Sequence, residues 1–295
     1  MHSVRFVPLV LCVALACGST ARAPARVSVI DDFGDTIGIG MAPARIVSLN
    51  PATTDLVFAV GAGGRLVGRT RWDTYPDSAR FVPDLGDGMR PNVEAILAAK
   101  PDLVLLYAGR DNLPARDALH RAGITTLSQR IDRVDEFSSG VILLGRVLGD
   151  SARAVVVRDS VLASLAHAHS LTADLPRPRV LWPLWESPLL VVGRGSFLDE
   201  LLAAAGATNL FEDFPSPSPQ VTFEEVLRRK PDVVLTTPDG AASIARDPRW
   251  RNVTAVRDGH VLVYDTLIVS RPSIRLGEAA MHLAHLLHPE LGARR

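Results

Sequence analysis

Cysteine is nearly absent from this chain of 295 residues, and the two that occur, Cys12 and Cys17, both lie close to its start. The rest of the chain can therefore form neither a disulfide nor a cysteine-ligated metal centre. An excess of charge of one sign is also lacking, because 32 basic residues balance 32 acidic ones. Nothing in this balance attracts nucleic acid or an anionic surface, so neither is expected as a partner.

The common catalytic motifs are missing as well. Neither of the two lysines follows a glycine, so there is no phosphate-binding loop of the Gly-Lys-Ser/Thr kind. Gly61-Ala62-Gly63 lacks the third glycine of a dinucleotide-binding fingerprint, and no Gly-x-Ser-x-Gly or His-Glu-x-x-His sequence occurs. We therefore expect a protein that is not an enzyme and that has no resident cofactor.

Long apolar runs are lacking beyond the first residues. The apolar stretch 6–16 is too short to span a bilayer, which requires ~20 residues, and is typical of an export signal. The sequence around Cys17 is similar to a bacterial lipoprotein processing site, and ordinary cleavage at a nearby alanine is the alternative. We predict a signal peptide over residues 1–25 and an exported protein in the periplasm or cell envelope, tethered to the membrane at most by a lipid on Cys17.

The two lysines mark a repeated segment. Residues 93–105, Val-Glu-Ala-Ile-Leu-Ala-Ala-Lys-Pro-Asp-Leu-Val-Leu, recur at 223–235 as Phe-Glu-Glu-Val-Leu-Arg-Arg-Lys-Pro-Asp-Val-Val-Leu. Each copy is typical of a short amphipathic helix followed by a buried strand, since proline cannot continue the helix. A single repeat at this wide spacing predicts two similar lobes rather than a solenoid of small units. Two lobes imply a cleft, where small molecules commonly bind.

The order of elements around each copy predicts an α/β fold. Buried strands such as 45–49 and 179–182 alternate with helices, which is typical of a mainly parallel, doubly wound sheet covered by helices. A hairpin is expected over 27–39, a helix after Asn50 with a threonine as its N-cap, and a final helix over 273–288.

A longer helix is expected between the two copies, from Ser151 to about Ser170. At ~1.5 Å per residue it is roughly 30 Å long, and its apolar positions at helical spacing are Val155, Val156, Leu162 and Leu165. It either connects the two lobes or is an ordinary surface helix. We divide the chain into an N-terminal lobe (26–149), a connecting helix (150–173) and a C-terminal lobe (174–295).

Aromatic residues make up only 5% of the chain, yet several cluster beside predicted strand ends: Trp72, Tyr75, Tyr107, Trp182 and Trp185. In a doubly wound lobe the carboxyl ends of the strands face the ligand crevice, and flat amphipathic rings suit a large, partly apolar ligand. Core packing is the alternative for each ring. Arg271 and Arg275 bracket the start of the final helix and are candidates to supply charge or hydrogen bonds to a ligand.

Three histidines form one stripe on the final helix: His282, His285 and His288. Such a stripe can in principle bind metal. Near a helix C-terminus it is more often a solvated face whose partial positive charge suits the helix dipole. We expect the solvated face and no metal site.

Several motifs together resemble those of one family. They are Arg45–Pro51 with Thr54-Asp55, both Lys-Pro-Asp segments, Gly193–Asp199 with Ala205–Asn209, and Arg271–Arg275. Over residues 45–287 they resemble the helical-backbone (class III) substrate-binding proteins of bacterial ABC importers for cobalamin, iron-siderophores and haem. The resemblance implies two α/β lobes joined by one long helix, with the ligand in the cleft between them. It also implies a monomer whose partners are the permease and ATPase subunits of an importer.

Within this family, the segment 68–76 is most similar to the cobalamin branch, in which the tyrosine equivalent to Tyr75 contacts the corrin. Tyr107 falls where that branch often has an aromatic, and Trp182 and Trp185 fall near another contact region. The resemblance thus implies cobalamin or another corrinoid as transported ligand. An iron-siderophore, favoured by a clustered basic pocket, and haem, favoured by a tyrosine or histidine poised for iron, are the alternatives. A metal-cluster oxidoreductase on a related scaffold is the alternative of a different class, against which the missing cysteines argue.

The resemblance gives the repeat a second meaning. In the family, one surface glutamate on each lobe docks into arginine pockets of the permease, and by position these are Glu94 and Glu224. Exposed carboxylates at equal offsets suit a two-point electrostatic contact with a two-fold partner. Both also suit the first turn of a helix, where acidic side chains are favourable near the dipole.

Overall fold

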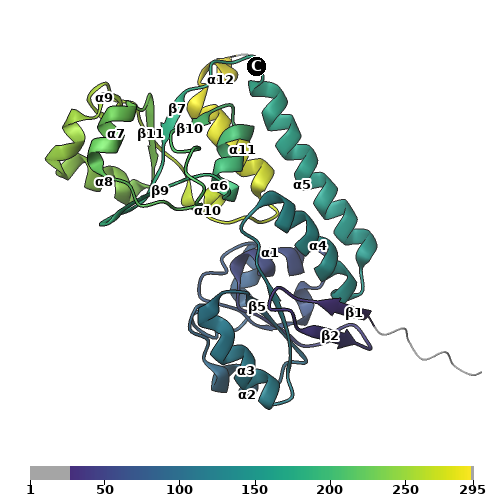
Figure 1. Ribbon diagram of the computed structural model, residues 1–295. Helices are drawn as coiled ribbons and strands as arrows, with labels where there is room; N and C mark the ends of the chain where they lie inside the picture. Colours follow the sequence, from purple (N-terminus) through teal and green to yellow (C-terminus); the bar gives the residue numbers. More distant parts are fainter. Residues whose placement is uncertain (1–26, 294–295) are drawn as a thin grey trace, which may run out of the picture.

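The computed structural model describes residues 27–293 and shows two α/β lobes joined by one long helix (Figure 1). The predicted signal peptide and Cys17 lie outside the described residues. The predicted hairpin is present as β1 (Val27–Ile30) and β2 (Thr36–Ile39), which pair antiparallel. No helix in this described part of the chain is long and apolar enough to cross a membrane.

The N-terminal lobe contains a four-stranded parallel sheet of order β4-β3-β5-β6. Its strands are β3 (Ile46–Ser48), β4 (Leu66–Gly68), β5 (Leu103–Tyr107) and β6 (Thr125–Gln129). Its helices are α1 (Pro51–Ala59), α2 (Val93–Ala98), α3 (Leu113–Arg121) and α4 (Val134–Leu148), with 3-10 turns at Gly63–Arg65, Asp77–Phe81 and Arg110–Asn112.

The C-terminal lobe contains a second parallel sheet, of order β10-β7-β11-β12, and a separate hairpin. The strands are β7 (Arg179–Leu181), β10 (Thr208–Asn209), β11 (Val233–Thr236) and β12 (Val261–Val263), and the hairpin is β8 (Pro183–Glu186) with β9 (Leu189–Val191). The helices are α6 (Phe197–Ala204), α7 (Phe223–Arg229), α8 (Pro238–Arg246), α9 (Thr254–Arg257), α10 (Thr266–Val269), α11 (Leu276–Leu287) and α12 (Glu290–Ala293), with a 3-10 turn at Pro248–Asn252.

The two sheets have the same topology. In each lobe the first strand lies between the second and the third, and the fourth lies at the edge beyond the third. The chain therefore adds its second strand on one side of the first strand and its third strand on the other. This reversal of strand order lies between β3 and β5 in one lobe and between β7 and β11 in the other. Ligands bind at such switch points, outside the carboxyl ends of the strands. The predicted fold class, two doubly wound lobes with mainly parallel sheets and a connecting helix, is confirmed.

The repeated Lys-Pro-Asp segments end their helices in the same way. Lys100 and Lys230 both have left-handed backbone conformations, with φ of 48° and 50°. Each aspartate then accepts a hydrogen bond at the start of the first strand of its parallel sheet. Asp102 accepts from the Arg45 N–H at 3.0 Å, and Asp232 accepts from the Arg179 N–H at 2.8 Å. The repeat thus anchors helix, turn and central strands together in both lobes.

The connecting helix α5 (Ser151–Thr172) packs on α4 of one lobe and on α6 and α11 of the other. Its buried positions are Ala154, Val161, Ala168 and Thr172, whereas Val155 and Val156 are exposed. The predicted apolar stripe is therefore wrong at these two valines. Close helix packing is the reason: a Cβ on Gly145 would overlap the Cβ of Ala154, and one on Gly277 would overlap that of Ser164. Small side chains let the backbones approach.

Three local expectations are also corrected. The N-cap of α1 is Asn50, not a threonine, because its side-chain oxygen accepts from the Ala52 N–H at 3.1 Å. The final helix begins at Leu276 rather than Ser273. The hairpin β8–β9 and the helices α8 to α10 were not expected; β8, β9, α9 and α10 have only three or four residues each, too few to show a period.

Candidate ligand cleft

Two hollows open at the carboxyl ends of the strands. The first, which we call the inter-lobe hollow, has a volume of about 580 Å³ and takes its walls from both lobes, including Asn50, Trp72, Tyr107, Asp132, Leu267 and Arg271. The second, the C-lobe hollow, has about 480 Å³ and is lined by residues that include Trp185, Glu186, Thr236, Asp239, Ser243 and Tyr264. Tyr264 of the second lies only two residues before Thr266 of the first. Both volumes fall within the range of ordinary small-molecule sites.

Trp72 and Tyr107 face the inter-lobe hollow from the N-terminal lobe. Trp72 follows β4 and is 60% exposed, so a large flat face is open to a ligand. Tyr107 ends β5, and its hydroxyl donates to Asp132, with both carboxylate oxygens at 2.9 Å. Burial, reinforced by the carboxylate of Asp132, raises the pKa of Tyr107 to about 12. This phenol therefore stays protonated at neutral pH.

Arg271 reaches across from the C-terminal lobe. One terminal nitrogen of its guanidinium donates to the Trp72 carbonyl at 3.4 Å, and Nε lies 3.7 Å from Oδ2 of Asp55 on α1. Asp55 is fully buried. Burial raises the pKa of Asp55 to about 7, although the positive charge of Arg271 opposes the rise. The predicted ligand residue Arg271 thus joins the lobes, and its buried counter-charge was not anticipated.

Tyr75 is placed differently from its predicted neighbours. The Arg275 guanidinium lies 4.7 Å from its ring centroid, a cation–π contact between the lobes. Arg275 is held by Glu278 through two hydrogen bonds of 2.7 Å. Tyr75 does not line either hollow, so the structure places it beside the cleft and not on its wall.

The two tryptophans after β7 have different surroundings. Trp182 is only 1% exposed and packs edge-to-face on Tyr264, with ring centroids 5.1 Å apart. Its expected direct contact with a ligand is therefore corrected: Trp182 is a core residue that supports Tyr264, because it lies beyond the last residue of β7 with its ring turned into the lobe. Trp185 is 63% exposed, lines the C-lobe hollow, and donates from its indole to the Ser187 carbonyl at 3.0 Å.

Sequence reasoning missed several cleft residues. Tyr264 directly follows β12, so the strand-end rule that singled out Tyr107 would have found it. Thr236 ends β11 and could have been found in the same way. Asp132 and Leu267 lie in irregular or short segments, and no sequence pattern marks them.

The predicted docking pair lies on matching helices. Glu94 and Glu224 are both exposed and both occupy the first turn, of α2 and α7 respectively. Each follows a side-chain N-cap by two residues: Asn92 accepts from the Ala95 N–H at 3.1 Å, and Thr222 from the Glu225 N–H at 3.2 Å. The pair is therefore presented in equivalent local geometry.

The histidine stripe does not form one surface. His282 accepts from the Asp265 N–H at 3.1 Å, and a ring nitrogen of His285 lies 2.8 Å from the Met281 carbonyl. His288 is 2% exposed and lies 3.1 Å from the Ala205 carbonyl, so the expected solvated face is wrong for this residue.

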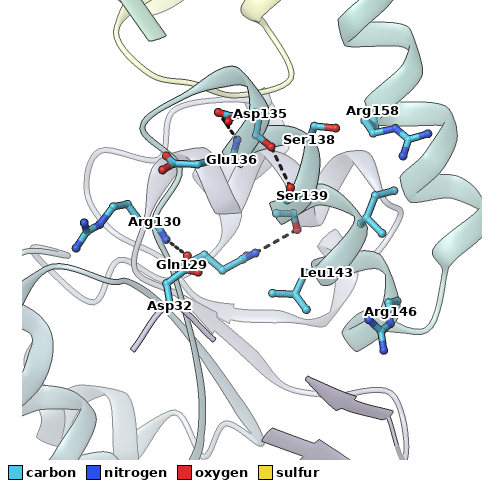
Figure 2. A pocket seen from close by; sticks show the side chains of 12 residues that line it. Asp32, Gln129, Arg130, Asp135, Glu136, Ser138, Ser139, Leu143, Arg146 and Arg158 are labelled. Carbon is cyan, nitrogen blue, oxygen red and sulfur yellow. Dashed lines mark hydrogen bonds between the residues drawn. The ribbon is translucent and has the colours of Figure 1, made fainter. Parts of the chain in front are cut away.

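A further hollow of about 590 Å³ lies on the flank of the N-terminal lobe, between α4 and α5 (Figure 2). Figure 2 shows Arg130 near Asp32 and Glu136 on one side, and Arg146 and Arg158 on the other. Asp32 is already engaged by the Arg130 N–H at 2.6 Å, and the buried Gln129 amide donates to the Gly140 carbonyl at 3.2 Å. All of its described lining residues belong to the N-terminal lobe or to α5, so it lacks the C-lobe wall that the cleft has.

Two lobes of equal topology, a helical connector and a hollow walled by both lobes define a bilobal binding-protein fold. The model of the family described as periplasmic binding protein matches residues 46–266, and the chain belongs to this family. An ABC transporter substrate-binding lipoprotein of Bacillus subtilis is 29% identical over 90% of this chain and 86% of its own length. A cobalamin-binding protein of Halobacterium salinarum is 31% identical over 98% of this chain and 86% of its own.

Solved structures agree with this assignment. The periplasmic haem-binding protein of Roseiflexus sp. RS-1, in its apo form, superposes with a TM-score of 0.75 at 26% identity. The match covers 83% of this chain and 98% of that one. Relatives of this chain thus include proteins named for two different tetrapyrrole-like ligands.

Proposed function

We propose that this chain is the substrate-binding protein of an ABC importer, and that its transported ligand is cobalamin or another corrinoid. It is exported and monomeric, it catalyses no reaction, and a lipid on Cys17 holds it at the membrane. Its membership of the periplasmic binding protein family and its relative among ABC transporter lipoproteins support the importer role. The cobalamin-binding relative supports the ligand class.

The charge of the cleft is the observation that carries the choice of ligand. Among the described residues that line the two hollows, the charged ones are three carboxylates, Asp132, Glu186 and Asp239, and one arginine, Arg271. Arg271 is matched by Asp55 when that carboxyl group is ionised. A cleft without a spare cation suits a ligand whose periphery is neutral. A corrinoid, with amide side chains around a flat ring, has this character, and exposed Trp72 and Trp185 offer faces for the ring.

The same observations disfavour the alternatives. An anionic ferric siderophore calls for a basic pocket, and the hollows contain none in the described part of the chain. Haem requires an iron ligand, yet none of the histidines in residues 27–293 lines either hollow. Two tyrosines line the hollows. Tyr107 is held in its protonated form beside Asp132. Tyr264 is buried against Trp182, and burial raises its pKa, so it too favours the neutral phenol. The likeness to haem-binding structures therefore supports the fold more strongly than it supports haem as ligand.

Glu94 and Glu224 complete the proposal as the contacts with the permease. They project from equivalent first turns of α2 and α7, and neither carboxylate has a hydrogen-bond or ion-pair partner within residues 27–293. A two-fold permease with basic pockets would meet both at once.

Titration of the purified protein with cyanocobalamin, haemin and a ferric siderophore tests the ligand. We expect saturable quenching of tryptophan fluorescence by cyanocobalamin, reduced in amplitude in Trp72→Phe and Trp185→Phe. Trp250 is 2% exposed and lines neither hollow, so Trp250→Phe is the matched control and should retain the full ligand-dependent change. Tight siderophore or haemin binding without a cyanocobalamin response would refute the proposal.

A further inference from the structure

Arg271 holds a special position in the cleft. It is the only cationic side chain among the described residues that line the inter-lobe hollow. Its own side chain is 14% exposed, so the guanidinium is largely removed from water. An arginine in such a setting is a strong binding group for a ligand carboxylate, because its planar donors match that group.

Asp55 lies directly behind the part of the inter-lobe hollow that the start of α1 lines. Asn50, Pro51 and Ala52, at the start of α1, line the hollow, and Asp55 follows one turn later on the same helix. It is fully buried, and within the described structure neither of its oxygens accepts a hydrogen bond of normal geometry. The nearby Ser273 hydroxyl favours the charged form and so lowers the pKa of Asp55, against the effect of burial. The closest charged neighbour of Asp55 is Arg271, 3.7 Å away.

The neighbouring carboxylate shows that this arrangement is particular to Asp55. Asp73 is equally buried, but its oxygens accept from the Thr54 and Thr70 hydroxyls at 2.8 Å each. Asp73 also accepts from the Thr70 N–H at 3.0 Å. Its charge is thus satisfied by local donors, whereas the charge of Asp55 is stabilised mainly by Arg271 and, to a smaller extent, by the Ser273 hydroxyl.

We propose that Asp55 is a specificity-determining residue. By pairing with Arg271 on the side away from the inter-lobe hollow, it neutralises the single cation among the described residues that line this hollow. The cleft therefore selects a ligand with peripheral amides over one with peripheral carboxylates. The residue acts through Arg271 and does not touch the ligand. This inference rests on the proposed function for the identity of the natural ligand.

The preference of the cleft for amide-bearing over carboxylate-bearing ligands should then depend on pH. The charged groups that face Asp55 are Arg271 and Arg275, from the segment that leads into α11, and Asp73, from the loop after β4. Burial places the pKa of Asp55 at about 7. Protonation of Asp55 below this value leaves Arg271 without its counter-charge, and the arginine then becomes available to a ligand carboxylate.

Cyanocobalamin and its three monocarboxylate derivatives, each with one propionamide converted to an acid, provide the test. At pH 8 we expect the natural chain to bind cyanocobalamin more tightly than each acid. In Asp55→Asn, at least one acid should gain roughly tenfold in affinity relative to cyanocobalamin, as a charge-assisted contact with Arg271 forms. In the natural chain the same ratio should rise between pH 8 and pH 6, and in Asp55→Asn it should stay constant.

Glu278→Gln is the matched control. It frees another arginine, Arg275, from its carboxylate, but Arg275 lines neither hollow. At pH 8, where Asp55 is ionised, the affinity ratio should therefore not change. The pH profile of the natural chain needs no variant, so the proposal is testable even if Asp55→Asn folds poorly. Unchanged ratios for all three acids, in the variant and across pH, would overturn it.

The outcomes separate this inference from the proposed function. Failure of the natural chain to bind cyanocobalamin refutes the corrinoid proposal alone. If the protein instead binds haemin, which carries two carboxylates, comparison with haemin dimethyl ester in the natural chain and Asp55→Asn tests the role of Asp55 in the same way. Binding of neither macrocycle would overturn both.

Discussion

The hydroxyl of Tyr107 donates to Asp132, whose two carboxylate oxygens both lie 2.9 Å away. The backbone carbonyl of Asp132 in turn accepts from the N–H of Phe197, in the other lobe, at 2.9 Å. A cleft-lining strand end is therefore linked through one aspartate to a contact between the lobes. Arg133 and Glu200, 3.1 Å apart, reinforce the same contact. The same residues thus form part of the wall of the inter-lobe hollow and fix the relative placement of the lobes.

The state of the Tyr107 phenol provides the first prediction. Its pKa is raised to about 12 by burial and then by the carboxylate of Asp132. Asp132→Asn removes the second cause, so the tyrosine should ionise at a lower pH. The ¹³Cζ resonance of Tyr107, assigned with Tyr107→Phe and followed up to about pH 10.5, should stay at its phenol position in the natural chain and begin to shift in Asp132→Asn. Equal titration in both would show that Asp132 has no such influence.

The second prediction concerns the docking pair. Replacing Glu94 and Glu224 together with alanine should abolish importer-dependent uptake while leaving ligand affinity unchanged, because both side chains lie on exposed first turns away from the hollows. Each single variant should lose part of the uptake, since one contact remains. Asp111 and Glu212 are also exposed, one on each lobe, and their double alanine variant is the control. Normal uptake by the Glu94→Ala, Glu224→Ala protein would refute the docking role.

The third prediction is a dependence of stability on pH. The pKa of Asp55 is about 7 in the folded protein, above its ordinary value of 3.8. Between these values the folded chain holds a proton that the unfolded chain has released, so the contribution of Asp55 to stability falls as pH rises from about 4 to about 7. Urea unfolding should show the natural chain losing up to about 1.4 kcal/mol per pH unit relative to Asp55→Asn in this window.

Above pH 7 the difference between the two proteins should become constant, because Asp55 is then ionised in both states. Asp111→Asn, at an exposed position, should follow the natural chain throughout and serves as the control. A difference that grows in favour of the natural chain as pH rises would show that Arg271 outweighs burial at Asp55.

Local patterns explain which features the sequence predicts well. The strand and helix of each repeat copy follow from apolar spacing and from proline, and the structure has both within one or two residues of the expected bounds. Strand ends and the start of a helix are visible as sequence positions. They single out Trp72, Tyr107 and Arg271 as candidates, and the structure brings all three to one hollow.

Features created by packing between distant segments were not predictable in this way. Asp55 and Arg271 lie close together only because the two lobes pack against each other at this point, and no sequence pattern links the two residues. Trp182 and Trp185 are separated by two residues, yet one is in the core and the other on the cleft, because the chain turns into the hairpin β8–β9 between them. The buried face of α5 was missed because most of its buried residues are small, and because it packs against glycines of α4 and α11 that no pattern within α5 reveals.

The fourth prediction tests this glycine-dependent packing. In α4, Gly145→Ala gains up to about 1 kcal/mol of helix propensity, but the new methyl group would overlap Ala154 of α5. Overpacking typically costs about 1–3 kcal/mol, so we expect net destabilisation of the free energy of unfolding. Ala154→Gly in the same chain removes the opposing methyl and should restore part of the loss, giving a positive coupling in a double-mutant cycle.

The same experiment applies at the other end of the connecting helix. Gly277→Ala in α11 would overlap Ser164 of α5, and Ser164→Gly should relieve it. Gly292→Ala is the control, because a Cβ there meets nothing within 4 Å. Since Gly145 belongs to one lobe and Gly277 to the other, crossing the two pairs (Gly145→Ala with Ser164→Gly) should give no rescue. Rescue by the mismatched glycine would mean that α5 shifts as a whole and does not hold two independent contacts. Additive effects in both matched pairs would refute the packing model.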